Sequence, residues 1–152
     1  MVDTTREGLP SAHITSLLAV STQAGPELWA GTMKGLARRT GAGRWRTEFQ
    51  TMGLKDPRIL CLQDGLDEEG SPVVWAGTEK GLLRFGPRGH SFFTQEDGLP
   101  DNRVFSLCRT LEPGGGESLW GGTRGGGIGR LKGGRWTHYR EAQGLKNLSV
   151  FC

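Results

Sequence analysis

Short apolar runs alternate with glycine-rich or polar turns along the whole chain, and the same order of runs returns about every 45 residues. Such runs between turn signals are typical of β-strands, and no segment shows the 3.6-residue period of a helix. We therefore predict four short strands per unit. The first is expected at Ile14–Val20, Ile59–Gln63 and Val104–Cys108, the second at Glu27–Thr32, Val73–Thr78 and Ser118–Thr123, and the third at Leu36–Arg39, Leu82–Phe85 and Ile128–Leu131. The fourth carries closing aromatic residues: Trp45 and Phe49, Phe92 and Phe93, then Trp136 and Tyr139.

Three landmarks define the repeat. A Trp-x-Gly-Thr motif occupies residues 29–32, 75–78 and 120–123, a Gly-Leu turn precedes it at residues 8, 53, 98 and 144, and a Gly-Leu/Ile-x-Arg motif follows it at residues 35–38, 81–84 and 127–130. The repeats therefore run from about 7 to 52, 53 to 97 and 98 to 143, with a partial repeat at 144–152. Four strands in a unit of this length are typical of a β-propeller blade. The 26 glycines and the missing helical period argue against a helical solenoid.

The predicted fold is all-β, with three four-stranded antiparallel blades plus the first strand of a fourth in one propeller segment over residues 1–152. Counted from each turn glycine, an apolar residue opens the first strand and a small residue follows two positions later: Ile14 and Ser16, Ile59 and Cys61, Val104 and Ser106, Val150 and Cys152. Closed propellers have four to eight blades, so this segment does not close a ring alone. The remaining blades of a longer parent chain could complete it, or self-association with strand exchange; the sequence leaves both open.

The repeated tryptophans Trp29, Trp75 and Trp120 are expected to pack between neighbouring blades rather than to contact a ligand. The glycine of Trp-x-Gly-Thr is expected to permit a close backbone approach or a bulge, and Gly35 and Gly81 are expected to supply positive φ angles in hairpin turns. The repeated Arg38, Arg84 and Arg130 are expected to pack on a tryptophan or to form an inter-blade ion pair rather than to bind a ligand.

The succession of Gly-Leu-Pro, Leu-Trp-x-Gly-Thr, Gly-Leu-x-Arg and paired aromatic residues resembles the two-component regulator propeller repeat, over roughly residues 7–152. The resemblance implies a non-catalytic, ligand-sensing propeller segment of a bacterial two-component-type signalling protein, in a periplasmic or extracytoplasmic location. A propeller that serves as a protein–protein interaction scaffold is the alternative. A propeller lyase or hydrolase is favoured less, because the inner strands carry no His/Glu constellation.

Composition and charge exclude several other classes. The net charge of +3 comes from interspersed acidic and basic residues and does not indicate a nucleic-acid partner. No apolar stretch is long enough for a transmembrane helix, and residues 1–6 lack the apolar core of a signal peptide. Motifs for catalysis, for a cofactor and for a metal site are missing. The three cysteines have no zinc-ligand spacing, and we expect buried free thiols.

One set of residues predicts a binding surface. Each unit carries a basic residue just before its first strand and another in the loop after its second: His13 and Lys34, Arg58 and Lys80, Arg103 and Arg124. In propellers these two loops open on the same face, so the six basic groups would surround one face and attract an anionic small molecule or saccharide, with the two arginines able to bind carboxylate or phosphate in a bidentate way. The alternative is that they are solvated loop charges, neutralised by Asp56, Glu79 and Asp101.

Overall fold

The computed structural model describes residues 7–49 and 58–152, and this part of the chain is built from three four-stranded sheets. Blade 1 consists of β1 (Ile14–Thr22), β2 (Gly25–Thr32), β3 (Gly35–Thr40) and β4 (Arg46–Phe49). Blade 2 consists of β5 (Ile59–Leu66), β6 (Pro72–Thr78), β7 (Leu82–Gly86) and β8 (Gly89–Phe93). Blade 3 consists of β9 (Val104–Leu111), β10 (Glu117–Thr123), β11 (Ile128–Lys132) and β12 (Arg135–Tyr139). Each sheet is antiparallel and follows sequence order, so the predicted all-β blades are confirmed.

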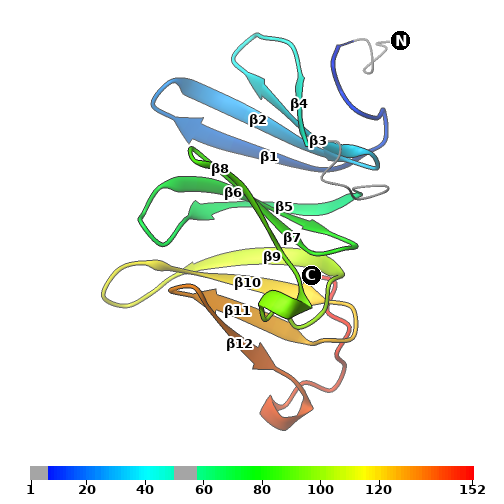
Figure 1. Ribbon diagram of the computed structural model, residues 1–152, viewed down its shortest axis with the longest axis vertical. Helices are drawn as coiled ribbons and strands as arrows, with labels where there is room; N and C mark the ends of the chain where they lie inside the picture. Colours follow the sequence, from blue (N-terminus) through cyan, green and yellow to red (C-terminus); the bar gives the residue numbers. More distant parts are fainter. Residues whose placement is uncertain (1–6, 50–57) are drawn as a thin grey trace.

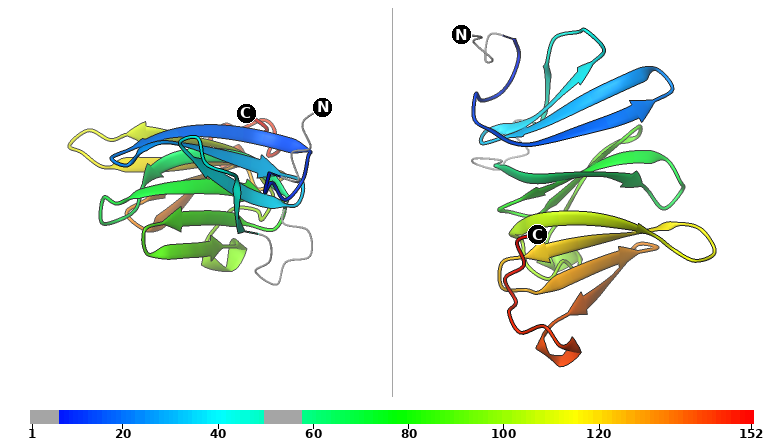
Figure 2. Two further views of the ribbon diagram at one scale, coloured as in Figure 1. Left: turned by 90° about the horizontal axis from the view of Figure 1, so that it is seen from above. Right: turned by 180° about the vertical axis from the view of Figure 1, so that it is seen from behind.

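The three blades stack along the long axis of the molecule, as Figure 1 shows. The first strands β1, β5 and β9 are neighbours in space, and the later strands of each blade spread away from them (Figure 2). Every blade has two ends. One, the loop end, carries the loop before the first strand and the loop between the second and third strands. The other, the hairpin end, carries the hairpins between strands one and two and between strands three and four.

The first strands extend further than the apolar pattern predicts, because backbone pairing continues through polar positions up to the hairpin. In blade 1 the pairing runs to Thr22 opposite Gly25. Two 3-10 turns, at Gln95–Asp97 and Glu141–Gln143, were not expected from the sequence. Thr94 caps the first, since its side chain accepts a hydrogen bond from the Glu96 backbone N–H. The Gly53-Leu54-Lys55 landmark lies outside the described residues.

The hydrophobic core lies between the blades rather than within them. Trp29 and Leu36 of blade 1 pack against Ile59, Leu83 and Phe85 of blade 2. Trp75 of blade 2 belongs to the second core cluster, which joins blades 2 and 3 and includes Val104, Leu119 and Leu131. The inter-blade packing predicted for these two tryptophans is therefore confirmed. We call the side of a blade that carries this tryptophan its trailing face and the opposite side its leading face.

In blades 1 and 2 the glycine of the Trp-x-Gly-Thr motif leaves a small notch in its strand, and the first strand of the next blade fills this notch. A Cβ atom on Gly31 would lie 2.6 Å from Cγ2 of Ile59, and one on Gly77 would lie 2.6 Å from the carbonyl oxygen of Val104. The same Cβ on Gly77 would meet Cys61 Sγ, in its own blade, at 2.5 Å. The predicted close approach is thus confirmed, and it explains why a small residue follows two positions after the apolar one. The hairpin glycines Gly35 and Gly81 have the predicted positive φ angles, 138° and 156°.

Candidate functional site

The predicted basic residues lie in loops that meet at the loop end of each blade. In blade 1 the His13 carbonyl accepts a hydrogen bond from the Met33 N–H (3.1 Å), next to Lys34. In blade 3 the Arg103 carbonyl accepts one from the Arg124 N–H (3.1 Å). The structure therefore brings the residues together as one pair per blade, all at the same end of the three sheets.

Acidic neighbours form ion pairs with two of the three arginines at this end. Arg58 forms a 3.0 Å ion pair with Glu79, and Arg103 forms a 3.3 Å ion pair with Asp101 and also donates to the Arg124 carbonyl. Within the described ranges, Lys34 and Lys80 are exposed and make no ion pair. The loop end thus keeps an excess of positive charge, carried by its lysines and Arg124, while two guanidiniums are partly neutralised. Asp56 lies outside the described residues.

A second recurring arrangement lies on the trailing faces, where an arginine from the third strand covers the tryptophan of the second. The guanidinium carbon lies 5.4 Å from the ring centroid for Arg38 and Trp29, 5.7 Å for Arg84 and Trp75, and 5.2 Å for Arg130 and Trp120. This geometry is that of a cation–π contact. The packing role predicted for these arginines is confirmed in all three blades.

Carboxylates that the sequence analysis did not single out hold these arginines in place. Arg38 pairs with Glu27 at 3.4 Å and Glu48 at 3.0 Å. Arg84 pairs with Glu68 at 2.8 Å, and Arg130 pairs with Glu112 at 2.6 Å. The carboxylates come from β2 and β4 in blade 1 but from the hairpin after the first strand in blades 2 and 3. Because they share no repeat position across the three blades, the repeat alignment does not reveal them.

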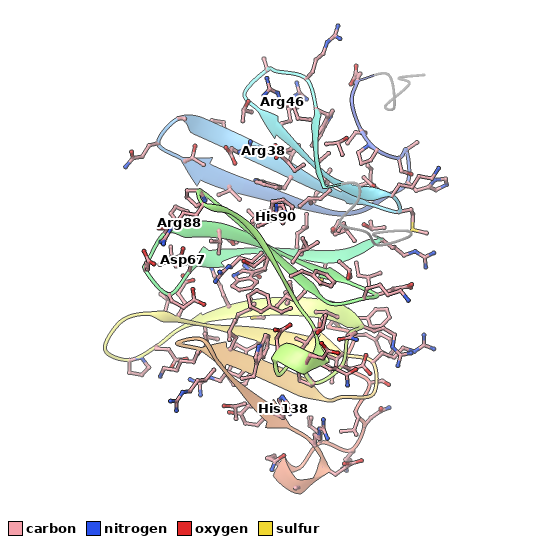
Figure 3. The ribbon with its side chains drawn as sticks, viewed as in Figure 1. Arg38, Arg46, Asp67, Arg88, His90 and His138 are labelled. Carbon is pink, nitrogen blue, oxygen red and sulfur yellow. The ribbon has the colours of Figure 1, made fainter. Side chains whose placement is uncertain are left out.

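Clefts open between neighbouring blades at the hairpin end. The cleft between blades 1 and 2 is about 370 Å³ in volume, with Trp29 and Phe85 among its lining residues and Arg38 and His90 at its sides (Figure 3). The cleft between blades 2 and 3, about 170 Å³, contains Trp75.

The second cleft is crossed by polar contacts between the blades. Arg109 of blade 3 pairs with Asp64 of blade 2 at 3.2 Å, and Glu117 accepts a hydrogen bond from the Leu66 N–H at 2.9 Å. Blade 1 has Ala19 at the repeat position of Asp64 and Arg109. The pair that crosses the second cleft therefore has no counterpart between β1 and β5.

The cluster around Glu112 predicts an acid-sensitive contact in blade 3. Hydrogen bonds from Ser118, Arg130 and Lys132 lower the pKa of Glu112 from its ordinary value of 4.5 to about 2. Because folding favours the charged carboxylate, this contribution to stability is complete above pH 4.5 and is lost as the pH falls toward 2. In urea unfolding at a series of pH values, Glu112→Gln should flatten the decline of the midpoint over this range. Equal declines in both proteins would contradict the assignment.

The histidines and cysteines of the described residues form no metal site or disulfide. His138 Nε2 lies 2.6 Å from the Gly98 carbonyl, and the described residues contain no group of His, Cys, Asp or Glu suited to a metal ion. All three cysteines are free, but only Cys61 is partly buried, and burial raises the pKa of its thiol to about 12. The expectation of burial is wrong for Cys108 and Cys152, which are exposed. Among the described residues, no helix is long and apolar enough to cross a membrane.

Neither a protein-family model nor a curated protein sequence matches the chain. Its fold does match solved structures. The extracellular domain of the hybrid two-component system BT3049 from B. thetaiotaomicron has a TM-score of 0.73 at 24% identity, over 97% of this chain and 21% of that one. The corresponding domain of BT4673 has a TM-score of 0.69 at 23% identity, over 99% of this chain and 20% of that one. Virginiamycin B lyase from Staphylococcus aureus has a TM-score of 0.61 at 18% identity, over 91% of this chain and 43% of that one.

These likenesses confirm the propeller fold, and they agree with the resemblance to the two-component regulator propeller repeat that the motifs indicate. The chain spans about a fifth of the length of the two extracellular domains that it resembles.

Proposed function

We propose that the chain is a non-catalytic recognition segment of an extracytoplasmic sensor propeller in a bacterial signalling protein. Three observations support this function: the repeat motifs, the blade architecture, and the fold shared with extracellular domains of hybrid two-component systems. At 18% to 24% identity each of these likenesses concerns the fold alone, so the repeat motifs are what favour a sensor over a lyase.

We place the ligand contact at the loop end, on the surface formed by His13, Lys34, Arg58, Lys80, Arg103 and Arg124. The observation that carries this assignment is the paired loops, which present basic residues at the same end of all three blades. Exposed lysine ammonium groups and arginine guanidiniums concentrated on one surface attract anions, and a carboxylate or phosphate of a ligand would compete with Glu79 and Asp101 for the two arginines. The ligand class is therefore an anionic small molecule or an anionic saccharide.

Charge reversal at the two arginines tests this site. We expect Arg58→Glu combined with Arg103→Glu to weaken binding of a galacturonate trimer or of glucose 6-phosphate about tenfold or more, measured by calorimetric titration. The matched control reverses Arg44 and Arg135, two exposed arginines at the hairpin end, so that the net charge changes equally.

The control should bind as the unchanged chain does. Equal affinities in all three proteins, or no binding of either anion by the unchanged chain, would contradict the site. Binding of a partner protein without either anion would instead favour the scaffold function.

A further inference from the structure

The cleft between blades 1 and 2 at the hairpin end is wider than the cleft between blades 2 and 3. Two polar contacts cross the second cleft: the ion pair of Arg109 with Asp64, and the hydrogen bond that Glu117 accepts from a backbone N–H of blade 2. The first cleft lacks the residues for both, because Ala19 stands at the repeat position of Asp64 and Pro72 stands at that of Glu117. Its volume of about 370 Å³ exceeds the 170 Å³ of the second cleft and suits a small molecule.

The lining of this first cleft is largely apolar and aromatic. Trp29 of blade 1 and Phe85 of blade 2 both line it, with their ring centroids 6.0 Å apart. Val20 and Val73 add aliphatic surface. His90, whose ring centroid lies 5.7 Å from that of Phe85, stands at one side (Figure 3). An aromatic ring that enters the cleft would displace water from these surfaces, which favours its binding.

The charged groups of the cleft include one more carboxylate than guanidinium. Glu27 and Glu48 both line it, and both pair with the single guanidinium of Arg38, at 3.4 and 3.0 Å. Only Oε1 of Glu48 takes part, accepting from Nε of Arg38 at 3.0 Å; its Oε2 has no hydrogen-bond partner among residues 7–49 and 58–152. The Glu48 side chain is 25% exposed. The cleft therefore offers an accessible carboxylate oxygen next to an apolar surface.

The other two pairs of a motif arginine with a motif tryptophan do not share this excess of negative charge. In blade 2, Arg84 pairs with Glu68 and with no other carboxylate of the described residues. In blade 3, the two cations Arg130 and Lys132 share the one carboxylate of Glu112. The surplus carboxylate thus occurs in blade 1, beside the wider of the two clefts.

We propose that the cleft between blades 1 and 2 binds a small aromatic amine, with a protonated ammonium group on a short chain attached to an aromatic ring. The ring packs against the surface around Trp29 and Phe85, and the ammonium donates to Oε2 of Glu48 in a charge-assisted hydrogen bond. A ligand carboxylate in the same place would be repelled by the surplus negative charge. This site therefore differs from the loop-end surface both in its place on the blades and in the charge of its ligand.

Phenethylamine is the probe, and calorimetric titration at neutral pH measures its binding to the chain. We expect one molecule per chain. Phenylpropionate, which keeps the ring but carries a carboxylate, should bind about tenfold more weakly or less, and so should butylamine, which presents the ammonium of a lysine side chain without a ring.

Glu48→Gln keeps the shape of the side chain and removes its charge, and should weaken phenethylamine binding about tenfold or more. The matched control, Glu68→Gln, makes the same change beside Arg84 and Trp75, outside the first cleft, and should leave the affinity unchanged. Thermal unfolding of both variants verifies that they are folded. The loop-end variant, Arg58→Glu with Arg103→Glu, should also bind phenethylamine as the unchanged chain does.

The proposal fails if the unchanged chain does not bind phenethylamine at millimolar concentration, or if it binds phenylpropionate equally well. Equal affinity for butylamine would also overturn it, because a lysine side chain of a partner protein would then suit the cleft as well as an aromatic amine does. Equal losses in Glu48→Gln and Glu68→Gln, or a loss in the loop-end variant, would place the amine outside this cleft.

Discussion

Replacing Gly77 by alanine is expected to destabilise the chain by about 3 kcal/mol, because overpacking a close-packed interface costs about 1 to 3 kcal/mol and the added methyl meets atoms on both sides. It would lie 2.5 Å from Cys61 Sγ and 2.6 Å from the Val104 carbonyl oxygen, and that carbonyl is backbone that cannot rotate away. Relief of the clash requires blades 2 and 3 to separate. The measurement is thermal unfolding followed by circular dichroism, where a loss of this size lowers Tm by roughly 10 °C in a domain of about 150 residues.

Gly121 supplies the matched control, since it is buried in the motif strand of blade 3 at the position where blades 1 and 2 have alanine. A Cβ atom there would lie 3.7 Å from Leu107 and 3.8 Å from Val104, which is ordinary van der Waals contact. Gly121→Ala should therefore leave stability unchanged or raise it by about 0.5 kcal/mol, through the lower backbone entropy of the unfolded chain. If both substitutions had equal effects, a general intolerance of the motif strands, rather than the notch, would be the cause.

The sequence predicted the blades because the repeat contains residues that the packing between blades or the geometry of a turn requires. Trp75 fills the gap to the next blade, Gly77 admits the next first strand, and Gly81 adopts a φ angle that other residues avoid. Each task recurs at a fixed spacing, so the repeat alone identifies it. The strand ends are less predictable. Asp64 and Arg109 interrupt the apolar pattern although they lie inside β5 and β9, because the backbone pairs whether or not the side chain is buried.

The ion pairs of the candidate site were harder to predict from the sequence than the strands were, because the partners of the arginines do not recur at fixed repeat positions. The repeat showed that Arg58 and Arg103 share a position, and Glu79 and Asp101 were named as neutralising charges, but the repeat did not show that Arg58 pairs across to Glu79 whereas Arg103 pairs with Asp101 two residues away. Likewise Arg38 and Arg130 recur, whereas Glu48 and Glu112 do not. Partners that come from unrelated positions depend on how loops fold back, which a linear repeat does not encode.

Truncation of Trp75 should destabilise the chain far more than truncation of Trp120, although the two tryptophans occupy the same repeat position. Trp75→Ala is expected to cost about 3 to 5 kcal/mol, because the side chain is 3% exposed and its removal leaves a cavity between blades 2 and 3. Trp120→Ala should cost about 1 kcal/mol or less, because the following blade does not cover it in this chain. Urea unfolding followed by circular dichroism gives both values, and Trp75→Phe provides a milder variant should the alanine protein fail to fold.

The same pair of variants also tests whether Trp120 contributes little to stability because the trailing face of blade 3 is uncovered. Because Val150-Phe151-Cys152 matches Val104-Phe105-Ser106, a copy of residues 107–143 appended after position 152 would give Trp120 a neighbour of the kind that Trp75 already has. Trp120→Ala should then cost about as much as Trp75→Ala, since the energy of the side chain comes from the surface that covers it. Equal costs at both positions in the original chain would mean that Trp120 derives its energy from its own blade, through Tyr139 and Arg130, and that burial between blades is not what the motif tryptophan contributes.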